Sequence, residues 1–265
     1  MKFRRILRVE AVVIAGTLFA ALVAYQAQLY VDIDSYPRGR WREGTTHGDW
    51  SVSAYQAQLY DDFDSYPRRR WREDTTHGDW FVSYDSNPCG RVGMLGVSGV
   101  YVADLSRCGR LKATKTRSLQ TFSNPLVIEM RFRIMQKALK DTKIWHTVWV
   151  GWHHSGDNRW NNLILKAGGW ELGKFHPACP HGGSNRNQCY LATGTKPKFA
   201  DGQWHTARIE QSANADGSQT IRAYGDGQLL ASVRDRRHLN RSGQVLLYNE
   251  GSVAEFDYVR AKRGK

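Results

Sequence analysis

Residues Val127–Ile134 read VIEMRFRI, in which apolar and charged side chains alternate from Ile128 onward. Successive side chains of a β-strand point to opposite faces of a sheet, so this period of two predicts a strand. The apolar positions would line a core, and the opposite face would carry Glu129, Arg131 and Arg133.

Two later stretches show the same alternation with a less usual second face. They are Trp145–His154, which reads WHTVWVGWHH, and Trp160–Ala167, which reads WNNLILKA. A solvated sheet face normally carries Thr, Ser, Lys and Glu, whereas tryptophan is uncommon there. The second face of these predicted strands carries Trp145, Trp149, His153, Trp160, Asn162 and Lys166, with Ile164 as an apolar exception.

An open face of indoles and polar groups suits a sugar. Pyranose rings present C–H patches that stack on indole, and their hydroxyls need fixed hydrogen-bond partners. Cationic side chains would pair with the carboxylate of a uronate. We therefore expect a groove in which the substrate is bound by Trp145, Trp149, Trp160, Asn162 and Arg133. The alternative is that loops or an extra segment cover the indoles, which then merely pack.

The rest of the chain consists of short β-prone runs separated by turn residues, which is typical of an all-β sandwich. The turn Gly225-Asp226-Gly227 predicts a hairpin between Thr220–Tyr224 and Leu229–Val233. Met135–Thr142 is expected to be a short helix or loop. We expect one antiparallel sandwich over residues 54–261 and a basic tail over 262–265. Further strands are expected at Trp204–Gln211, Gln244–Tyr248 and Ala254–Val259.

The composition suits a folded, basic protein. Of the 265 residues, 41% are hydrophobic and 12% aromatic, which is enough for a buried core and excludes wholesale disorder. The net charge of +13 favours polyanions such as acidic polysaccharide, anionic lipid or nucleic acid, although a solvated surface without a specific partner explains it equally well. No nucleic-acid-binding motif accompanies the charge, so no nucleic-acid partner is expected.

The first 24 residues have the pattern of an export signal. A basic start with Lys2, Arg4, Arg5 and Arg8 precedes the uncharged apolar run Ala11–Ala24. This run is short for a membrane span, which needs about 20 residues, and suits the core of a signal peptide. No clean small-x-small cleavage triplet follows it, so residues 1–24 are expected to be a signal peptide or an uncleaved N-terminal membrane anchor. Either way, the protein is expected to be extracytoplasmic, secreted or membrane-anchored.

Four cysteines agree with export. An even count in an oxidising compartment predicts two local disulfides, Cys89–Cys108 and Cys179–Cys189. A zinc site at Cys179 is the rival interpretation, because His176 and His181 flank it, but the chain has no CxxC pair.

Residues 24–53 and 54–83 form a tandem repeat of 30 residues. Two near-identical copies indicate an internal duplication, because a solenoid needs at least three repeats to bury a continuous core. We expect the second copy to join the sandwich, since Phe63 and Phe81 supply apolar anchors, and residues 25–53 to be a partly ordered spacer. The copies differ at Val31/Asp61, Ile33/Phe63, Gly39/Arg69, Gly44/Asp74 and Ser51/Phe81.

Five motifs follow one another along the chain: Asp61-Asp62-Phe63-Asp64, Gly78-Asp79-Trp80, Asp201-Gly202-Gln203-Trp204-His205-Thr206, Tyr224-Gly225-Asp226-Gly227-Gln228 and Glu255-Phe256-Asp257-Tyr258-Val259. In this order they resemble concanavalin A-like domains, which include laminin-G-like modules, polysaccharide lyases and the 3-keto-disaccharide-hydrolase-like family. The resemblance implies an antiparallel jelly-roll β-sandwich, here preceded by an N-terminal hydrophobic helix. Related jelly rolls hold a structural Ca²⁺ between the first and last strands, and Asp62 and Asp257 match those positions. The alternative to a calcium site is that Asp62 and Asp257 are two aspartates at sheet edges that face solvent.

The segments Glu129-Met130-Arg131, Gly151-Trp152-His153 and Ile164–Trp170 resemble, in this order, three strands of jelly-roll alginate lyases. The resemblance implies β-elimination, with His153 as the base, Arg131 neutralising the carboxylate, and Glu129 and Lys166 completing the site. Gly151 and Trp170 depart from the lyase pattern, which leaves the acid unassigned unless Tyr190 supplies it. Jelly-roll glucanases use a Glu-x-Asp-x-Glu strand, and that triplet does not occur in this sequence.

Two functions remain open at this point. The first is lyase-like cleavage of an extracellular or cell-wall polysaccharide, with an anionic polymer favoured by the basic charge. The second is a non-catalytic, lectin-like carbohydrate-binding module. In both cases we expect a monomer whose partner is a glycan.

Overall fold

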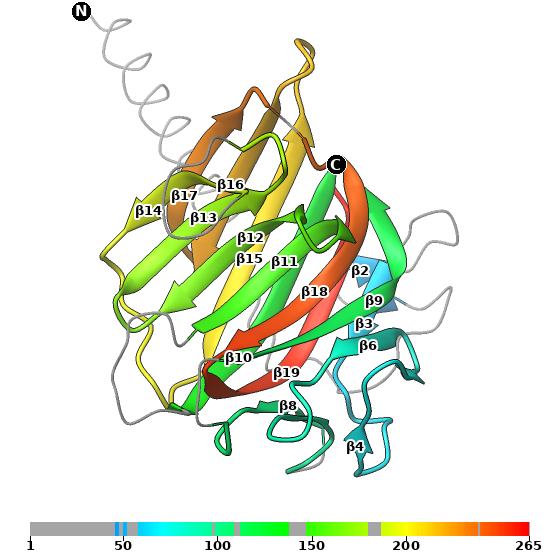
Figure 1. Cartoon of the computed structure of the whole chain (residues 1–265). Helices are drawn as coiled ribbons and strands as arrows, with labels where there is room; N and C mark the ends of the chain where they lie inside the picture. The colour runs from blue at the N-terminus through cyan, green and yellow to red at the C-terminus, as the bar shows by residue number, and fades with distance from the viewer. Residues whose placement is uncertain are drawn as a thin grey trace, which may run out of the picture. The chain divides into compact units, whose positions relative to one another are not determined.

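The computed structural model describes residues 46–47, 50–51, 58–96, 99–108, 112–137, 147–179, 187–237 and 239–264. Apart from a short hairpin of β1 (Thr46–His47) and β2 (Trp50–Ser51), the described strands form two antiparallel sheets (Figure 1). The described residues contain no helix, and the expected hydrophobic helix falls outside them. The all-β prediction is therefore confirmed for the described chain.

We call the two layers the β10 sheet and the β11 sheet. In the β10 sheet the order is β17-β16-β15-β10-β19-β8-β7-β4, with β3 also paired to β19. In the β11 sheet the order is β14-β13-β12-β11-β18-β9-β6-β5. The β10 sheet consists of β3 (Gln58–Asp61), β4 (Arg70–Trp71), β7 (Arg91–Gly93), β8 (Tyr101–Asp104), β10 (Leu126–Lys137), β15 (His205–Ala213), β16 (Gln219–Gly225), β17 (Gln228–Asp235) and β19 (Ser252–Arg263). The β11 sheet consists of β5 (Thr76–His77), β6 (Trp80–Tyr84), β9 (Ala113–Ser123), β11 (Thr147–Gly156), β12 (Arg159–Lys166), β13 (Gly169–Phe175), β14 (Gln188–Gly194) and β18 (Ser242–Glu250).

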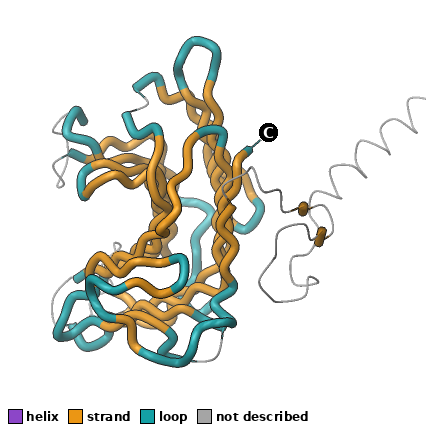
Figure 2. Tube along the Cα trace, turned by 90° about the vertical axis from the view of Figure 1, so that its right-hand side faces the viewer, coloured by secondary structure: helices purple, strands orange, loops and turns teal. Residues whose placement is uncertain are grey.

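The core lies between the two sheets, which stand face to face in Figure 2. The alternation in Val127–Ile134 is confirmed, because every second residue of β10 is buried in this core and its charged residues point outward. Strands β11 and β12 contribute in the same way from the opposite layer. The inward residues of these three strands are Ile128, Met130, Phe132, Ile134, Val148, Val150, Trp152, Leu163 and Leu165.

Strand β19 connects several parts of the β10 sheet. It pairs with β10 from Leu126↔Arg263 to Lys137↔Ser252, and it also pairs with β3 and β8. Residues 262 and 263, expected to be tail, therefore belong to a strand, and residues 135–137, expected to be helix or loop, continue β10. The predicted hairpin at Gly225-Asp226-Gly227 is confirmed, since Gly225 pairs with Gln228 at the end of β16 and β17.

The two copies of the repeat form the same local hairpin. In the first copy, Thr46 pairs with Ser51 and His47 with Trp50. In the second copy, thirty residues later, Thr76 pairs with Phe81 and His77 with Trp80. The second copy also supplies β3, β4 and the start of β6, and so takes part in both sheets. Most of the first copy lies outside the described residues.

Candidate functional site: the outer face of the β11 sheet

A second apolar cluster lies on the outer face of the β11 sheet, on the side away from the core. Rings from four strands meet here: Trp160 and Phe175 stack at 5.0 Å between centroids, and Trp149 lies 5.1 Å from Tyr248. The cluster consists of Trp149, Trp160, Ile164 and Leu246, with Phe175 and Tyr248 packed against it. We call these six residues the aromatic cluster.

The two indoles form the floor of the aromatic cluster. Trp149 is 6% exposed and Trp160 is 5% exposed, so the structure favours the packing interpretation for both over open stacking platforms. A Cβ atom on Gly151 would lie 3.0 Å from Cε3 of Trp160, so the glycine allows the indole to lie against the backbone. The exposed aromatic surface comes instead from Tyr190, which is 48% exposed. Trp145 lies outside the described residues.

A polar group borders the aromatic cluster on the side of β9 and β6. Lys115 is ion-paired with Asp157, and its Nζ atom lies 4.9 Å from the ring centroid of Tyr84. The Tyr84 ring in turn lies 6.5 Å from that of Tyr248, edge to face. Glu250 follows on the same strand face as Tyr248, and burial raises the pKa of this carboxyl to about 7. Glu250 is therefore partly protonated near neutral pH and can donate a hydrogen bond.

On the opposite side of the cluster, Lys166 and Glu171 form an ion pair between neighbouring strands. Burial, followed by the nearby charge of Glu171, raises the pKa of Tyr190.

Asn162 lies between Gly151 and Gly173 in the strand register, fully buried, and neither atom of its side-chain amide has a hydrogen-bond partner. Of the predicted residues, Trp149, Trp160, Asn162 and Lys166 therefore share this face, with Asn162 beneath its surface.

His153 is not on this face. The pairing of β11 with both neighbours is irregular between Gly151 and Gly156, and His153 adopts a positive φ of 52°. This bulge breaks the period of two and turns the ring inward, so the predicted position of His153 is wrong. The ring is fully buried, and burial lowers its pKa to about 4.

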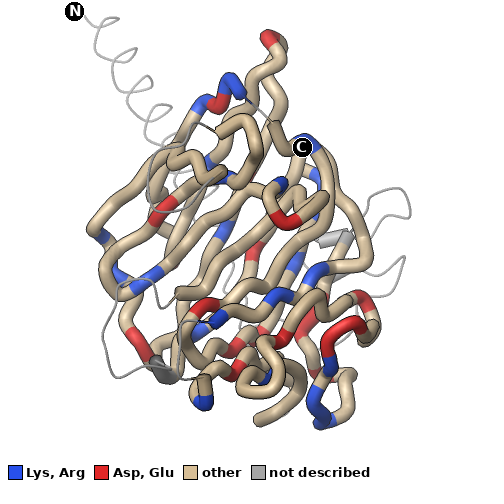
Figure 3. The backbone as a smooth tube through the Cα atoms, viewed as in Figure 1, with Lys and Arg blue, Asp and Glu red and all other residues tan. Residues whose placement is uncertain are grey.

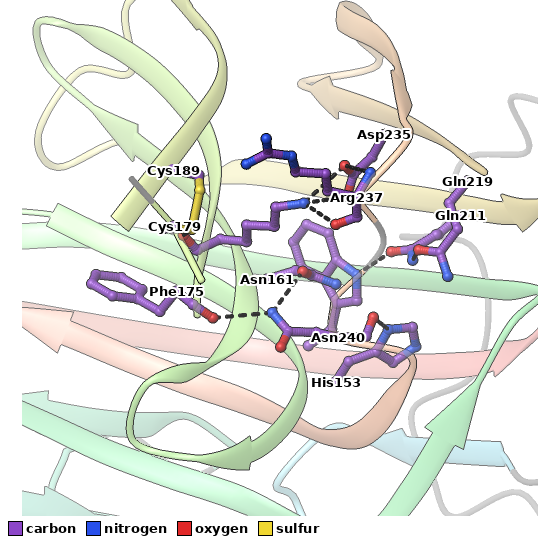
Figure 4. A network of polar contacts seen from close by, with 12 residues as sticks. His153, Asn161, Phe175, Cys179, Cys189, Gln211, Gln219, Asp235, Arg237 and Asn240 are labelled. Carbon is purple, nitrogen blue, oxygen red and sulfur yellow. Dashed lines mark hydrogen bonds and ion pairs between the residues drawn. A yellow bond between two sulfur atoms is a disulfide. The ribbon is translucent and has the colours of Figure 1, made fainter. Parts of the chain in front are cut away.

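The surroundings of His153 are a polar network at one end of the sandwich (Figure 4). Its Nδ1 atom donates to the carbonyl oxygen of Asn240, whose side chain donates to Asn161 Oδ1 and to the carbonyl of Phe175, both at 3.1 Å. Lys174 binds the Asp235 carboxylate and the carbonyl of Arg237 in the same region. These contacts join the two sheets, so His153 has a structural environment rather than that of a base facing substrate.

Glu129, Arg131 and Arg133 lie on the outer face of the β10 sheet, on the other side of the sandwich. Glu129 is buried and accepts hydrogen bonds from Tyr258, at 2.9 Å, and from Arg260, at 2.6 Å. Arg131 pairs with Asp257 and Arg133 with Glu255, while Trp204 lies beneath both guanidinium groups. The predicted catalytic set of His153, Arg131, Glu129 and Lys166 is therefore not brought together.

The calcium expectation remains a prediction. Asp257 already pairs with Arg131, and burial leaves Asp62 8% exposed, with one of its oxygens accepting from the backbone of Asp64. Within the described part of the chain, no three His, Cys, Asp or Glu side chains meet in a way that would hold a metal ion.

Both predicted disulfides are confirmed: Cys89 is bonded to Cys108, and Cys179 to Cys189. They suit an oxidising compartment. Among the described residues, no helix has the length and apolar character that a membrane crossing requires.

Sequence reasoning missed several residues of this face, among them Tyr84, Phe175, Leu246, Tyr248 and Glu250. Leu246, Tyr248 and Glu250 alternate along β18 with the core residues Val245 and Leu247, and this alternation was available as a signal. It could show that they share a face, but not that the face adjoins Trp149, because that contact depends on the pairing of β18 with β11.

Comparisons with known protein families and with curated proteins find no match to this chain. Solved structures do match in fold. One is described as Rv0315, an immunostimulatory antigen and pseudo β-1,3-glucanase of Mycobacterium tuberculosis; it is 13% identical, has a TM-score of 0.50, and the match covers 78% of this chain and 98% of that one. Another is a Bacillus licheniformis β-glucanase, 12% identical with a TM-score of 0.49, covering 78% and 98% of the two chains. At such identities the likeness concerns the fold alone, and it confirms the concanavalin A-like jelly roll.

Proposed function

We propose that this protein is a carbohydrate-active jelly roll that binds a polysaccharide on the outer face of the β11 sheet, as a lectin-like module. The observation that carries the proposal is the aromatic cluster, which gathers Trp149, Trp160, Phe175 and Tyr248 on the outside of a sheet, with Tyr190 exposed nearby. Tyr190 is exposed and Phe175 and Tyr248 are half-buried, so these three rings, and not the two buried indoles beneath them, offer a face to a pyranose ring beside hydrogen-bonding groups. The fold likeness to a protein described as a pseudo β-1,3-glucanase supports the same ligand class.

Binding is favoured over lyase-like cleavage because the elimination chemistry lacks an assembled site. The predicted base, His153, is fully buried, and the predicted neutraliser, Arg131, lies in the other sheet with a carboxylate partner of its own. A base and a charge neutraliser must both reach one sugar unit. The described residues offer no such pair at the positions that the sequence suggested.

Export completes the proposal. Two disulfides agree with an extracytoplasmic protein that meets its polysaccharide outside the cell. Secretion or attachment to the membrane through residues 1–24, and a monomeric state, are further parts of the proposal; fractionation distinguishes the first two, and light scattering checks the third.

A retention experiment on immobilised polysaccharides tests the proposal. The protein is expected to be retained, and Tyr190→Ala should weaken retention about fivefold to thirtyfold, which corresponds to about 1–2 kcal/mol of lost stacking. Tyr224→Ala is the matched control, because Tyr224 lies on the β10 sheet and pairs with Glu210. Equal retention of all three proteins would remove Tyr190 from the site. Release of ultraviolet-absorbing unsaturated ends from a uronate polymer would restore the lyase interpretation.

A further inference from the structure

A half-open hollow of about 420 Å³ adjoins the aromatic cluster. It lies where β9, β18 and the end of β11 meet, and its walls include Arg117, Thr121, His154, Ser155, Ser242 and Gln244. Arg117 stands directly opposite Leu246, a member of the aromatic cluster, and His154 opposite Gln244. A chain of sugars bound along this face would therefore bring a neighbouring unit to the hollow.

Arg117 differs from Lys115 and Lys166, the cations on either side of the aromatic cluster, in having no acidic partner at ion-pair distance. Lys115 pairs with Asp157 and Lys166 with Glu171, whereas Arg117 donates from Nη1 to the neutral amide oxygen of Gln244 at 2.8 Å. Its guanidinium lies over the ring of Phe81, 4.5 Å from the centroid, which holds the side chain in place. Its Nε atom is buried without a hydrogen-bond partner. Arg117 thus forms no ion pair within the described chain and keeps one free donor, although the carboxylate of Asp157, which is bonded to Lys115, acts on its charge from a distance.

His154 adds a second buried polar group to the same wall. The residue is 6% exposed, and its ring nitrogens make no hydrogen bond of good geometry, although the side chain of Gln244, which already accepts from Arg117, lies beside the ring. Burial, and after it the positive charge of Lys115, lower its pKa to about 4, so the ring is neutral at pH 7 and carries one N–H donor. A buried polar group without a partner costs about 1–3 kcal/mol, which a ligand acceptor would recover.

We propose that this hollow is an oxyanion subsite, in which Arg117 and His154 bind the carboxylate or sulfate group of an acidic sugar in the polysaccharide. A planar guanidinium matches the two oxygens of such a group, and the hydroxyls of Thr121, Ser155 and Ser242 suit the hydroxyls of the ring that carries it. A volume of this size suits one substituted sugar ring. Figure 3 shows Lys and Arg spread over the backbone among Asp and Glu, and the excess of basic residues, which gives a net charge of +13, favours the approach of such a polymer. This inference rests on the proposed function and names its substrate class.

The experiment is calorimetric titration of the full chain with three oligosaccharides of equal length: an oligogalacturonate, a sulfated galactan and a neutral β-glucan. The wild type should bind at least one of the two acidic oligosaccharides about tenfold more tightly than the neutral one. Tighter binding of the oligogalacturonate would assign the subsite to a carboxylate, and tighter binding of the galactan would assign it to a sulfate. Arg117→Gln should abolish this preference, so that the acidic and the neutral oligosaccharides bind the variant with affinities within about twofold of each other. Arg222→Gln, an exposed arginine on the β10 sheet, is the matched control and should keep the preference.

A second variant guards against a folding defect. Gln244→Glu places a carboxylate beside Arg117 with little change of shape, so it should remove the acidic preference while thermal unfolding stays close to that of the wild type. Equal affinity of the wild type for neutral and acidic oligosaccharides would overturn the subsite and leave the proposed function standing. A preference that survives both Arg117→Gln and Gln244→Glu would also overturn the subsite. Binding of no oligosaccharide and no polysaccharide would overturn the proposed function together with the subsite.

Discussion

The indole Nε1 of Trp80 donates to Oδ2 of Asp61 at 2.8 Å, inside the sandwich. The same carboxylate accepts from the hydroxyl of Tyr66 at 2.6 Å and from the backbone N–H of Phe63 at 2.8 Å. Trp80 is fully buried and Asp61 is 6% exposed, so each of these groups depends on the others for its hydrogen bonds. The first copy of the repeat carries Val31 where the second carries Asp61.

The hydrogen bond between Trp80 and Asp61 explains why the second copy of the repeat, and not the first, occupies the sandwich. Asp61→Val should lower the free energy of unfolding by about 2–4 kcal/mol, because it leaves the Trp80 and Tyr66 donors buried without partners. Urea unfolding measures the change. Arg69→Gly, another of the five repeat differences, is the control at an exposed residue and should cost less than about 1 kcal/mol. Comparable losses in the two variants would contradict this explanation.

Phe63 gives the second copy a further advantage. Its ring is fully buried and lies within 5.6–6.3 Å of the rings of Tyr66, Trp80 and Tyr101, and its φ is 60°. Phe63→Ile, the residue of the first copy, should therefore cost about 2–4 kcal/mol, because it removes ring contacts and places a β-branched side chain at positive φ. Phe81→Ser, at a half-buried ring, should cost less. Thermal unfolding would reject this ranking if the order were reversed.

The inward ring of His153 predicts acid sensitivity. Its folded pKa of about 4 lies below the value of 6.5 expected in the unfolded chain, so between these values the unfolded state binds a proton that the folded state refuses. His153 should thereby lower stability by roughly 3 kcal/mol as the pH drops from 6.5 to 4, and His154, whose pKa is also lowered to about 4, should add a similar loss. His153→Asn keeps a residue that tolerates positive φ and should remove about half of this slope, as measured by urea unfolding at several pH values. An unchanged slope would mean that His153 does not carry the effect.

The buried carboxyl of Glu250 predicts a dependence of stability on pH that is opposite in sign to that of His153. Burial raises its folded pKa to about 7, so between pH 4.5 and 7 the unfolded state loses a proton that the folded state keeps, and stability falls as the pH rises through this window. Glu250→Gln stays neutral and should be more stable than the wild type at pH 8, by about 1–3 kcal/mol, and close to it at pH 4.5. Thermal melts at the two pH values make the comparison. Glu255→Gln, at an ion-paired surface carboxylate, should show no such gain.

The position of Glu129 predicts that its substitution changes the stability of the protein without changing its binding of polysaccharide. Glu129→Gln should lower the free energy of unfolding by about 2–4 kcal/mol, because Arg260 is buried and loses the charge that balances it. Retention on polysaccharide should not change at a temperature where the variant is folded, since Glu129 is in the sheet opposite the aromatic cluster. Loss of retention by the folded variant would return Glu129 to the site.

The sequence by itself determined the local properties of the chain. The alternation in Val127–Ile134 showed which side chains of β10 face the core, and the same holds for Val148, Val150, Leu163 and Leu165. It also determined the disulfides and the hairpin at Gly225-Asp226-Gly227, because short separations along the chain bring these residues together. Each of these features depends on a period or a spacing that can be read within a few residues.

Only the tertiary structure decided which faces adjoin. Strands β10 and β11 follow one another in the chain, yet β10 pairs with β15 and β19, while β11 pairs with β12 and β18. Their second faces therefore point to opposite sides of the sandwich, and Arg131 and Trp149 cannot share a groove. One bulge then turned His153 inward. The physical reason is that side-chain direction is set by the local backbone, whereas the neighbours of a strand are set by hydrogen bonds to strands that lie far away in the sequence.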